Sequence, residues 1–322
     1  MNFRKISLLR NIAYTILAAL TITACGSDGD GDGDKQQANI NKNTNYTDRA
    51  ATRIEVPHLR GGNSKFIVYR VSDTSFDKDG VNYCVEWDRD LKANRWTSYI
   101  LTKANITKHV SRWYASQGEL QYPFDTQNLT LADYYTDSRG SDLLYGSGFD
   151  HGHLCPSNDR LYSTAVNKQT FNLTNMQPQF SVFNGSDRNH PYSGLWIDIE
   201  NKINNFISGN SFTKDDTLFI CKGGTIDSED QILSRIQNKV IVPKYFYAAV
   251  VWKRTKLNLY SGIAFWCEHT NVYHGNEALR GYAISIGELE KKLGGNIDFF
   301  CNLPDEIEKK VEKTAATLDF GL

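Results

Sequence analysis

Two short polar segments carry the residue types that hydrolytic chemistry requires. The first contains Asp150-His151-Gly152-His153, in which a glycine between two histidines permits a tight turn. The second, Asn175-Met176-Gln177-Pro178-Gln179, begins nineteen positions after Pro156. A histidine with an ordinary pKa is the natural general base near neutral pH, and an amide oxygen can hold a hard cation. These residue types therefore favour metal-assisted cleavage of a phosphodiester.

Individual roles can be assigned from the chemistry of each side chain. We expect His153 to take a proton from water and Asn184 to bind Mg²⁺, because this ion keeps several waters and needs few protein ligands. Glu200 is expected to orient a water on that ion. Asn175 is included in the catalytic set as the residue that braces the site. Asp150 is expected to stabilise the turn through backbone hydrogen bonds.

Four elements in this order resemble the DNA/RNA non-specific endonuclease family, whose ββα-metal (His-Me finger) sites carry an Asp-Arg-Gly-His motif. Asp150 to His153 corresponds to that motif, and Thr174 to Gln179 matches the family's Asn-x-x-Pro-Gln element. Asn184 lies where the family has its metal-binding Asn. Trp196 and Glu200 match a Trp-x-x-x-Glu element. The resemblance covers roughly residues 55–315.

The resemblance implies a ββα-metal fold and a metal-dependent endonuclease. Such an enzyme would hydrolyse DNA and/or RNA to 5′-phosphate products with Mg²⁺ (or Mn²⁺). It would hold its substrate through backbone phosphates, which carry no sequence information.

The chain departs from the family pattern at two places. His151 replaces the family's arginine, which removes a fixed cation. Eleven residues separate Asn184 from Trp196, where the family has three, so Gly185 to Leu195 contains an insertion. Asn189 and His190 of this insertion are further candidates, and Arg112 and Arg160 are candidate phosphate contacts.

Hydrophobic periodicity predicts the elements that must position these residues. Alternating or aromatic-rich runs indicate strands, and apolar residues at helical spacing indicate helices. The two kinds of element do not alternate regularly, which favours an α+β fold with a mixed, mainly antiparallel sheet and flanking helices. The predicted strands are 65–71, 82–87, 96–102, 217–221, 245–252 and 259–266, and the predicted helices are 195–207, 284–293 and 304–315.

The first residues are typical of a targeting signal. Residues 1–24 combine a positive start with an apolar run that is too short to span a bilayer. A cysteine follows them directly, as in a bacterial lipoprotein signal. Cys25 is therefore the expected lipidation site, which would attach the protein to a membrane of the bacterial envelope, with the outer-membrane surface as a candidate location. Residues 25–52 are expected to be a flexible tether and residues 53–322 the endonuclease domain.

The charge balance requires local rather than global recognition of nucleic acid. The formal net charge is −1, and setting aside the three cations of the signal and the four aspartates of residues 28–34 leaves 33 basic and 33 acidic residues. A phosphate-rich partner must therefore meet a local basic patch. The cysteines other than Cys25 fit an oxidising compartment, where two disulfides and one free thiol are expected in a pairing that the sequence leaves open.

Two other functions remain open at this point. The loss of the family's arginine and the insertion would also suit a catalytically impaired nuclease-like envelope module that binds nucleic acid or a partner. The aromatic content and the anchor would suit a glycan-binding surface lipoprotein.

Overall fold

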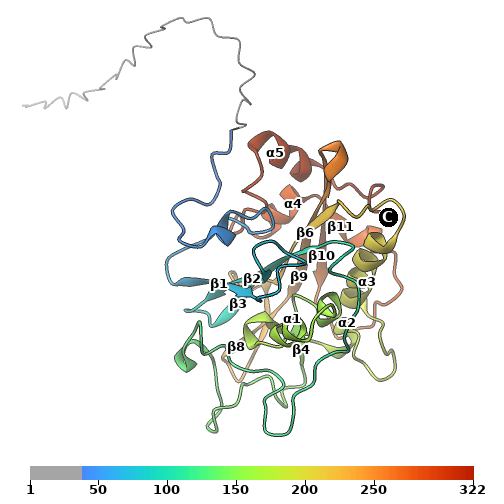
Figure 1. The fold of residues 1–322 in the computed structure, drawn as a ribbon. Helices are drawn as coiled ribbons and strands as arrows, with labels where there is room; N and C mark the ends of the chain where they lie inside the picture. The colour runs from blue at the N-terminus through green and yellow to red at the C-terminus, as the bar shows by residue number, and fades with distance from the viewer. Residues whose placement is uncertain (1–37) are drawn as a thin grey trace, which may run out of the picture. The chain divides into compact units, whose positions relative to one another are not determined.

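A seven-stranded antiparallel sheet runs through the centre of the computed structural model, which describes residues 38–322 (Figure 1). The strands lie in the order β1-β2-β3-β6-β9-β10-β11, and every neighbouring pair is antiparallel. Their bounds are β1 (Ser64–Arg70), β2 (Val81–Asp88), β3 (Ala93–Leu101), β6 (Thr217–Gly224), β9 (Tyr245–Arg254), β10 (Leu259–Glu268) and β11 (Ala283–Ile284).

The sheet is buried on both faces, as the alternation along β9 shows. Phe246, Val250 and Trp252 belong to one hydrophobic cluster, whereas Tyr247 and Val251 belong to a second cluster on the opposite face. This separation follows from the two-residue period of a strand. The sheet therefore has a layer of structure on each side.

Helices cover the two faces differently. The second cluster is closed by α4 (Ile286–Lys292) and α5 (Asp305–Lys313), which lie together at one end of the molecule (Figure 1). The first cluster is closed by α3 (Leu195–Ser208), whose apolar residues face the sheet at helical spacing. The layer on the α3 side of the sheet also holds the polar motifs.

Those motifs form a separate small sheet beside α3. β4 (Asp150–His153) pairs with β5 (Met176–Gln179), and the short helices α1 (Thr164–Gln169) and α2 (Ser181–Asn184) lie close to them in the chain. A further hairpin joins β7 (Ile232–Ile236) to β8 (Val240–Pro243), and β8 contacts β5. Two strands followed by a helix thus carry the predicted site, as the ββα arrangement requires.

The predicted α+β class, the six predicted strands and the three predicted helices are confirmed, with shifts of a few residues at their ends. The tether was expected to reach residue 52, but residues 38–52 pack against the body. Asn43 is buried and donates to the carbonyls of Ala51 and Pro57, and the Asn39 side chain donates to the Leu303 carbonyl. The ordered body therefore begins earlier than expected.

The expected signal and Cys25 lie outside the described residues. Within residues 38–322, no helix is long and apolar enough to cross a membrane. The expected disulfides are not formed in that range, since all its cysteines are free and buried: Cys84, Cys155, Cys221, Cys267 and Cys301. They are distributed among the core clusters as small apolar side chains.

Candidate active site

Three of the four residues predicted for catalysis and metal binding meet in one cleft of about 750 Å³. His153 of β4, Asn184 of α2 and Glu200 of α3 all line it, together with Asp150 and Arg112. The sequence separates these residues by up to 88 positions, and the fold brings them to one cavity. Asn175 does not line this cleft.

Asn175 holds the strand that carries His153. Its side chain is fully buried; the Cys155 N–H donates to its Oδ1, and its Nδ2 donates to the Cys155 and Thr170 carbonyls. The Leu154 N–H also donates to the Asn175 carbonyl. All the polar atoms of Asn175 are engaged by backbone, so its side chain holds this segment together and has no polar atom left for another partner.

The His153 side chain projects from β4 into the cleft with one nitrogen unpaired. Its Nε2 is buried and has no hydrogen-bond partner within the described residues. Burial lowers the pKa of His153 well below its ordinary value, and the nearby charges of Arg112 and His151 act in the same direction. A hydrogen bond with the His151 backbone partly opposes this shift in pKa. His153 is therefore neutral near neutral pH and can accept a proton.

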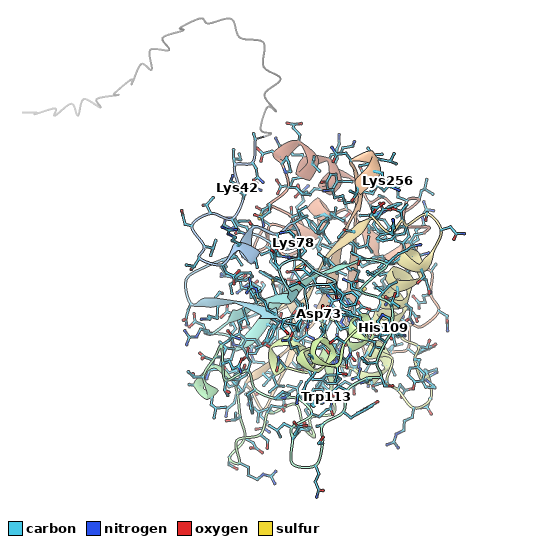
Figure 2. The ribbon with its side chains drawn as sticks, viewed as in Figure 1. Lys42, Asp73, Lys78, His109, Trp113 and Lys256 are labelled. Carbon is cyan, nitrogen blue, oxygen red and sulfur yellow. The ribbon has the colours of Figure 1, made fainter. Side chains whose placement is uncertain are left out.

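Arg112 is brought close to His153 through a shared aromatic ring. The Arg112 guanidinium lies 4.7 Å from the Phe171 ring centre, and the His153 ring meets that ring edge-on at 5.0 Å. Trp113, labelled in Figure 2, packs edge-on against Phe171 at 5.2 Å. Arg112 thus supplies a cation on the wall of the cleft, where an anionic substrate could meet it.

Asp150 orients the Asn184 amide. The Asn184 Nδ2 donates to Asp150 Oδ2 at 3.0 Å, and the Ser186 hydroxyl donates to the same oxygen. No hydrogen bond to the Asn184 Oδ1 is recorded within residues 38–322, so this oxygen is free for another partner. A neutral oxygen held in place by a carboxylate fits a Mg²⁺-type cation that keeps most of its waters. The Asp150 side chain thus bonds to two other side chains, and the expectation that it stabilises its turn through backbone hydrogen bonds is not confirmed within residues 38–322.

Two glycines keep Asn184 in register with α3 despite the insertion. Gly185 ends α2 with φ of 82°, and a Cβ there would lie 2.4 Å from the Ile197 side chain. A Cβ on Gly194 would lie 2.4 Å from the Val182 carbonyl oxygen. One end of the inserted segment thus packs against α3 and the other end against α2. The extra residues form an outward loop that leaves Asn184 and Glu200 in the same cleft.

His269 fixes the start of α2 through hydrogen bonds at both of its ring nitrogens. Its Nδ1–H donates to the Pro243 carbonyl at 2.9 Å, and its Nε2 accepts from the Phe180 N–H at 2.8 Å. Burial lowers the pKa of His269 to about 4, so the neutral form that this pairing requires is present at ordinary pH. No motif surrounds His269 in the sequence, so this positioning role could not be found there.

Glu200 pairs with a buried lysine that sequence reasoning missed. The Lys222 Nζ lies 2.5 Å from Glu200 Oε1, and the lysine side chain is fully buried while that of Glu200 is 16% exposed. Burial raises the pKa of Glu200, and Lys222 opposes this shift. Asp159, which also lines the cleft, adds to the rise in the Glu200 pKa.

His151 and Arg160 do not present free cations to a phosphate. The His151 Nε2 pairs with Asp142 Oδ1 at 3.1 Å, and its ring stacks on Tyr122 at 3.9 Å. Arg160 is buried and donates to the side chain and carbonyl of Asn82. The expectation that Arg160 contacts phosphate is therefore wrong. Of the two candidate arginines, Arg112 is the one that lines the cleft.

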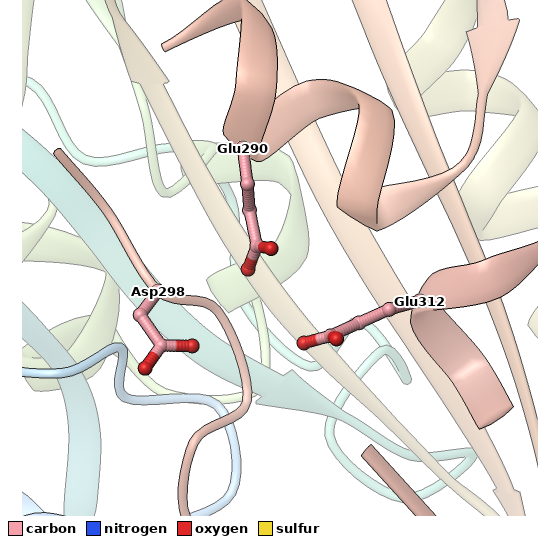
Figure 3. A group of neighbouring side chains, drawn as sticks. All are labelled: Glu290, Asp298 and Glu312. Atoms are coloured by element: carbon pink, nitrogen blue, oxygen red, sulfur yellow. The ribbon is translucent and has the colours of Figure 1, made fainter. Parts of the chain in front are cut away.

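A second group of carboxylates lies elsewhere in the molecule. Glu290, Asp298 and Glu312 come from α4, the following loop and α5, and their oxygens lie within 4.8 Å of one another (Figure 3). Burial raises the pKa of each of them. None lines the cleft, so this group is separate from the predicted metal site.

Comparison with known proteins gives consistent matches. The model of the DNA/RNA non-specific endonuclease family matches residues 65–306. A nuclease of Nostoc sp. is 29% identical over 53% of this chain, and the match spans only 57% of that relative. Nuclease C1 of Cunninghamella echinulata is 26% identical over 69% of this chain and 81% of its own length. The solved EndoG/EndoGI complex contains a chain with a similar fold, with a TM-score of 0.54 and 17% identity over 74% of this chain and 88% of that one.

Proposed function

This chain belongs to the DNA/RNA non-specific endonuclease family, a family of divalent-metal-dependent nucleases, and from that premise we propose that it hydrolyses DNA and/or RNA to 5′-phosphate products with Mg²⁺. The observation that carries the proposal is the meeting of an unpaired neutral imidazole and a free amide oxygen in one cleft.

The side chains divide the reaction between them. His153 Nε2 takes a proton from the attacking water, which needs the neutral form that burial favours. Asn184 Oδ1 would hold the divalent cation. Asp150 accepts a hydrogen bond from Asn184 Nδ2, so the Asn184 Oδ1 is turned away from the Asp150 carboxylate. A cation bound there supplies charge neutralisation at the leaving 3′-oxygen.

Glu200 and Arg112 complete the proposed machinery. Glu200, anchored by Lys222, accepts a hydrogen bond from water in the cleft and so orients it. Arg112 binds a non-bridging phosphate oxygen. It thereby supplies part of the positive charge that the family's arginine provides at the position of His151. Contacts with phosphate carry no information about base sequence, which suits a nuclease that cuts without sequence specificity.

Plasmid degradation tests the proposal. Cleavage in Mg²⁺ should stop with EDTA, and His153→Ala should lower the rate by about 10²- to 10⁴-fold. His58→Ala is the matched control, since His58 is exposed and does not line the cleft. Nucleic-acid binding by wild type without cleavage would instead identify an impaired, binding-only module, and neither activity would favour the glycan binder.

Asn184→Ala separates the metal role from substrate binding. The metal-dependent rate should fall far more than the affinity for nucleic acid, because phosphate contacts remain. Equal losses in rate and affinity would show that Asn184 is not the metal ligand.

We also propose that Cys25 carries a lipid that attaches the protein to the bacterial envelope, on the support of the sequence pattern alone. Metabolic labelling with a fatty acid should mark the wild-type protein and not Cys25→Ala. Release of the unlabelled protein from the membrane fraction should accompany the loss of label.

A further inference from the structure

Exposed aromatic side chains gather around the cleft. Four aromatic residues are exposed in the part of the chain that the structure describes, and three of them, Tyr114, Tyr145 and Tyr192, line this cavity. Their exposed fractions are 70%, 48% and 83%. Aromatic rings left in water beside a site are typical of surfaces that bind a partner.

The three tyrosines come from separate segments that converge on the cleft. Tyr114 lies between β3 and β4, Tyr145 lies just before β4, and Tyr192 belongs to the insertion. The Tyr145 ring lies 4.9 Å from the His151 ring, which itself stacks on Tyr122. An aromatic surface therefore continues from the rim of the cleft to its wall.

Tyr192 is held in a conformation that a bulky residue rarely adopts. Its φ is 61°, in the left-handed region, and its N–H donates to the Gly185 carbonyl at 2.9 Å. Such backbone strain persists only where the surrounding structure enforces it, and it gathers at functional sites. The insertion thus presents an exposed ring at the cleft rather than tucking it into the core.

The charges of the cleft favour a substrate held by more than its phosphates. Its cations are Lys108 and Arg112, and the Lys108 Nζ is already bonded to Asn158 Oδ1 at 2.7 Å. Asp159 and Glu200 face the same space. Duplex binding draws on many Lys and Arg contacts with phosphates, and this lining holds only two such side chains. Unpaired bases can stack on tyrosine rings regardless of sequence.

We infer that the cleft selects single-stranded nucleic acid, whose unpaired bases stack on Tyr192, Tyr114 and Tyr145 beside the scissile phosphate. This inference rests on the proposed nuclease function and names the substrate class of the same site. The insertion is then a specificity element, because it supplies the most exposed of the three rings.

Cleavage of three matched substrates by the full-length protein tests the inference. The substrates are a mixed-sequence single strand, its blunt duplex and an abasic strand with the same number of phosphates. Wild type should prefer the single strand over each of the others by at least about tenfold in kcat/KM, since base stacking contributes most of the difference. Tyr192→Ala should lower the ratio of single-strand to abasic kcat/KM by about 5- to 100-fold, mainly through KM.

Two variants control this measurement. Tyr192→Phe keeps the ring and should retain the wild-type ratio. Tyr46→Ala removes an exposed tyrosine that does not line the cleft and should leave all rates unchanged.

The outcomes distinguish the inference from the function on which it rests. Equal rates on single strand and duplex, or a ratio that Tyr192→Ala leaves unchanged, would overturn the substrate preference while the nuclease activity stands. Absence of cleavage of every substrate in Mg²⁺ would overturn both.

Discussion

The buried pair of Lys222 and Glu200 makes a prediction whose size can be worked out. Lys222 Nζ lies 2.5 Å from Glu200 Oε1, and Coulomb's law with an effective dielectric constant of about 20 gives a gross attraction of about 7 kcal/mol. Desolvation offsets much of this attraction, so the net contribution of the pair is smaller. Removal of one partner should nevertheless be strongly destabilising, because it leaves the other charge uncompensated in the interior.

In each single variant, the loss in the free energy of unfolding cannot exceed the free energy needed to neutralise the charged partner that remains. In Glu200→Gln, Lys222 must lose its proton, and an unfolded lysine has a pKa of about 10.4, so this requires about 5 kcal/mol at pH 7. In Lys222→Met, Glu200 must gain a proton from an unfolded-state pKa of about 4.3, which requires about 4 kcal/mol. Both values agree with the range of about 3–5 kcal/mol expected for broken buried pairs.

The two variants should respond to pH in opposite directions. A lysine that is neutral in the folded state has a lowered pKa there, so the loss in Glu200→Gln shrinks as the pH rises. A glutamate that is neutral in the folded state has a raised pKa there, so the loss in Lys222→Met grows as the pH rises. In each variant, the change of this loss with pH should approach about 1.4 kcal/mol per pH unit.

Urea unfolding of both single variants and the double variant, at about pH 7 and about pH 9, measures these effects. The double variant should be much less destabilised than the sum of the singles, since neither charge is left alone. Losses below about 1 kcal/mol in both singles, simple additivity in the double, or pH slopes of the same sign would refute the reasoning.

Three further predictions concern the hairpin, the carboxylate group and the metal. A Cβ on Gly152 would lie 2.2 Å from the Gln179 side chain, so Gly152→Ala should destabilise the fold by about 1–3 kcal/mol and lower kcat. When Gln179→Ala is combined with Gly152→Ala, part of the lost stability and part of the lost kcat should return, as measured by thermal unfolding and rate assays. Burial raises the pKa of Glu290 and Glu308 to about 7 and that of Glu312 to about 8. Because these folded-state pKa values exceed the unfolded ones, stability should fall between about pH 5 and about pH 8, and Glu312→Gln should reduce that fall in the urea midpoint. EDTA should abolish cleavage without lowering the thermal midpoint, because a cation held by one protein oxygen adds little stability.

The central sheet could be predicted from the sequence because both of its faces are buried. Strands such as β9 and β10 are long and rich in aromatic and β-branched residues, so each forms a nearly continuous apolar run in the sequence. The hairpin that carries the site gave no such signal. Asp150 to His153 and Met176 to Gln179 are four-residue strands with mostly polar side chains, too short and too polar to show a hydrophobic pattern. They were found through their motifs and not through their hydrophobicity.

Contacts between distant residues account for what the sequence could not predict. Lys222 stands before two glycines at the end of a strand, and nothing local indicates that its partner lies on α3. Arg160 looked like a free cation beside the motif, but Asn82, 78 positions away, engages it in the interior. A charged residue can thus be assigned to a cleft or to the core only after its partner has been placed.

The insertion shows why residue spacing alone misjudges a site. Counted along the chain, eight extra residues should separate the metal ligand from the helix that carries Glu200. In the fold, Gly185 packs against Ile197 of α3 and Gly194 packs against the Val182 carbonyl of α2, so both ends of the loop lie where these two helices meet. The added residues project Tyr192 over the cleft instead. A closed loop can therefore change what a site binds without changing the residues at its reactive centre, which is the role we infer for Tyr192.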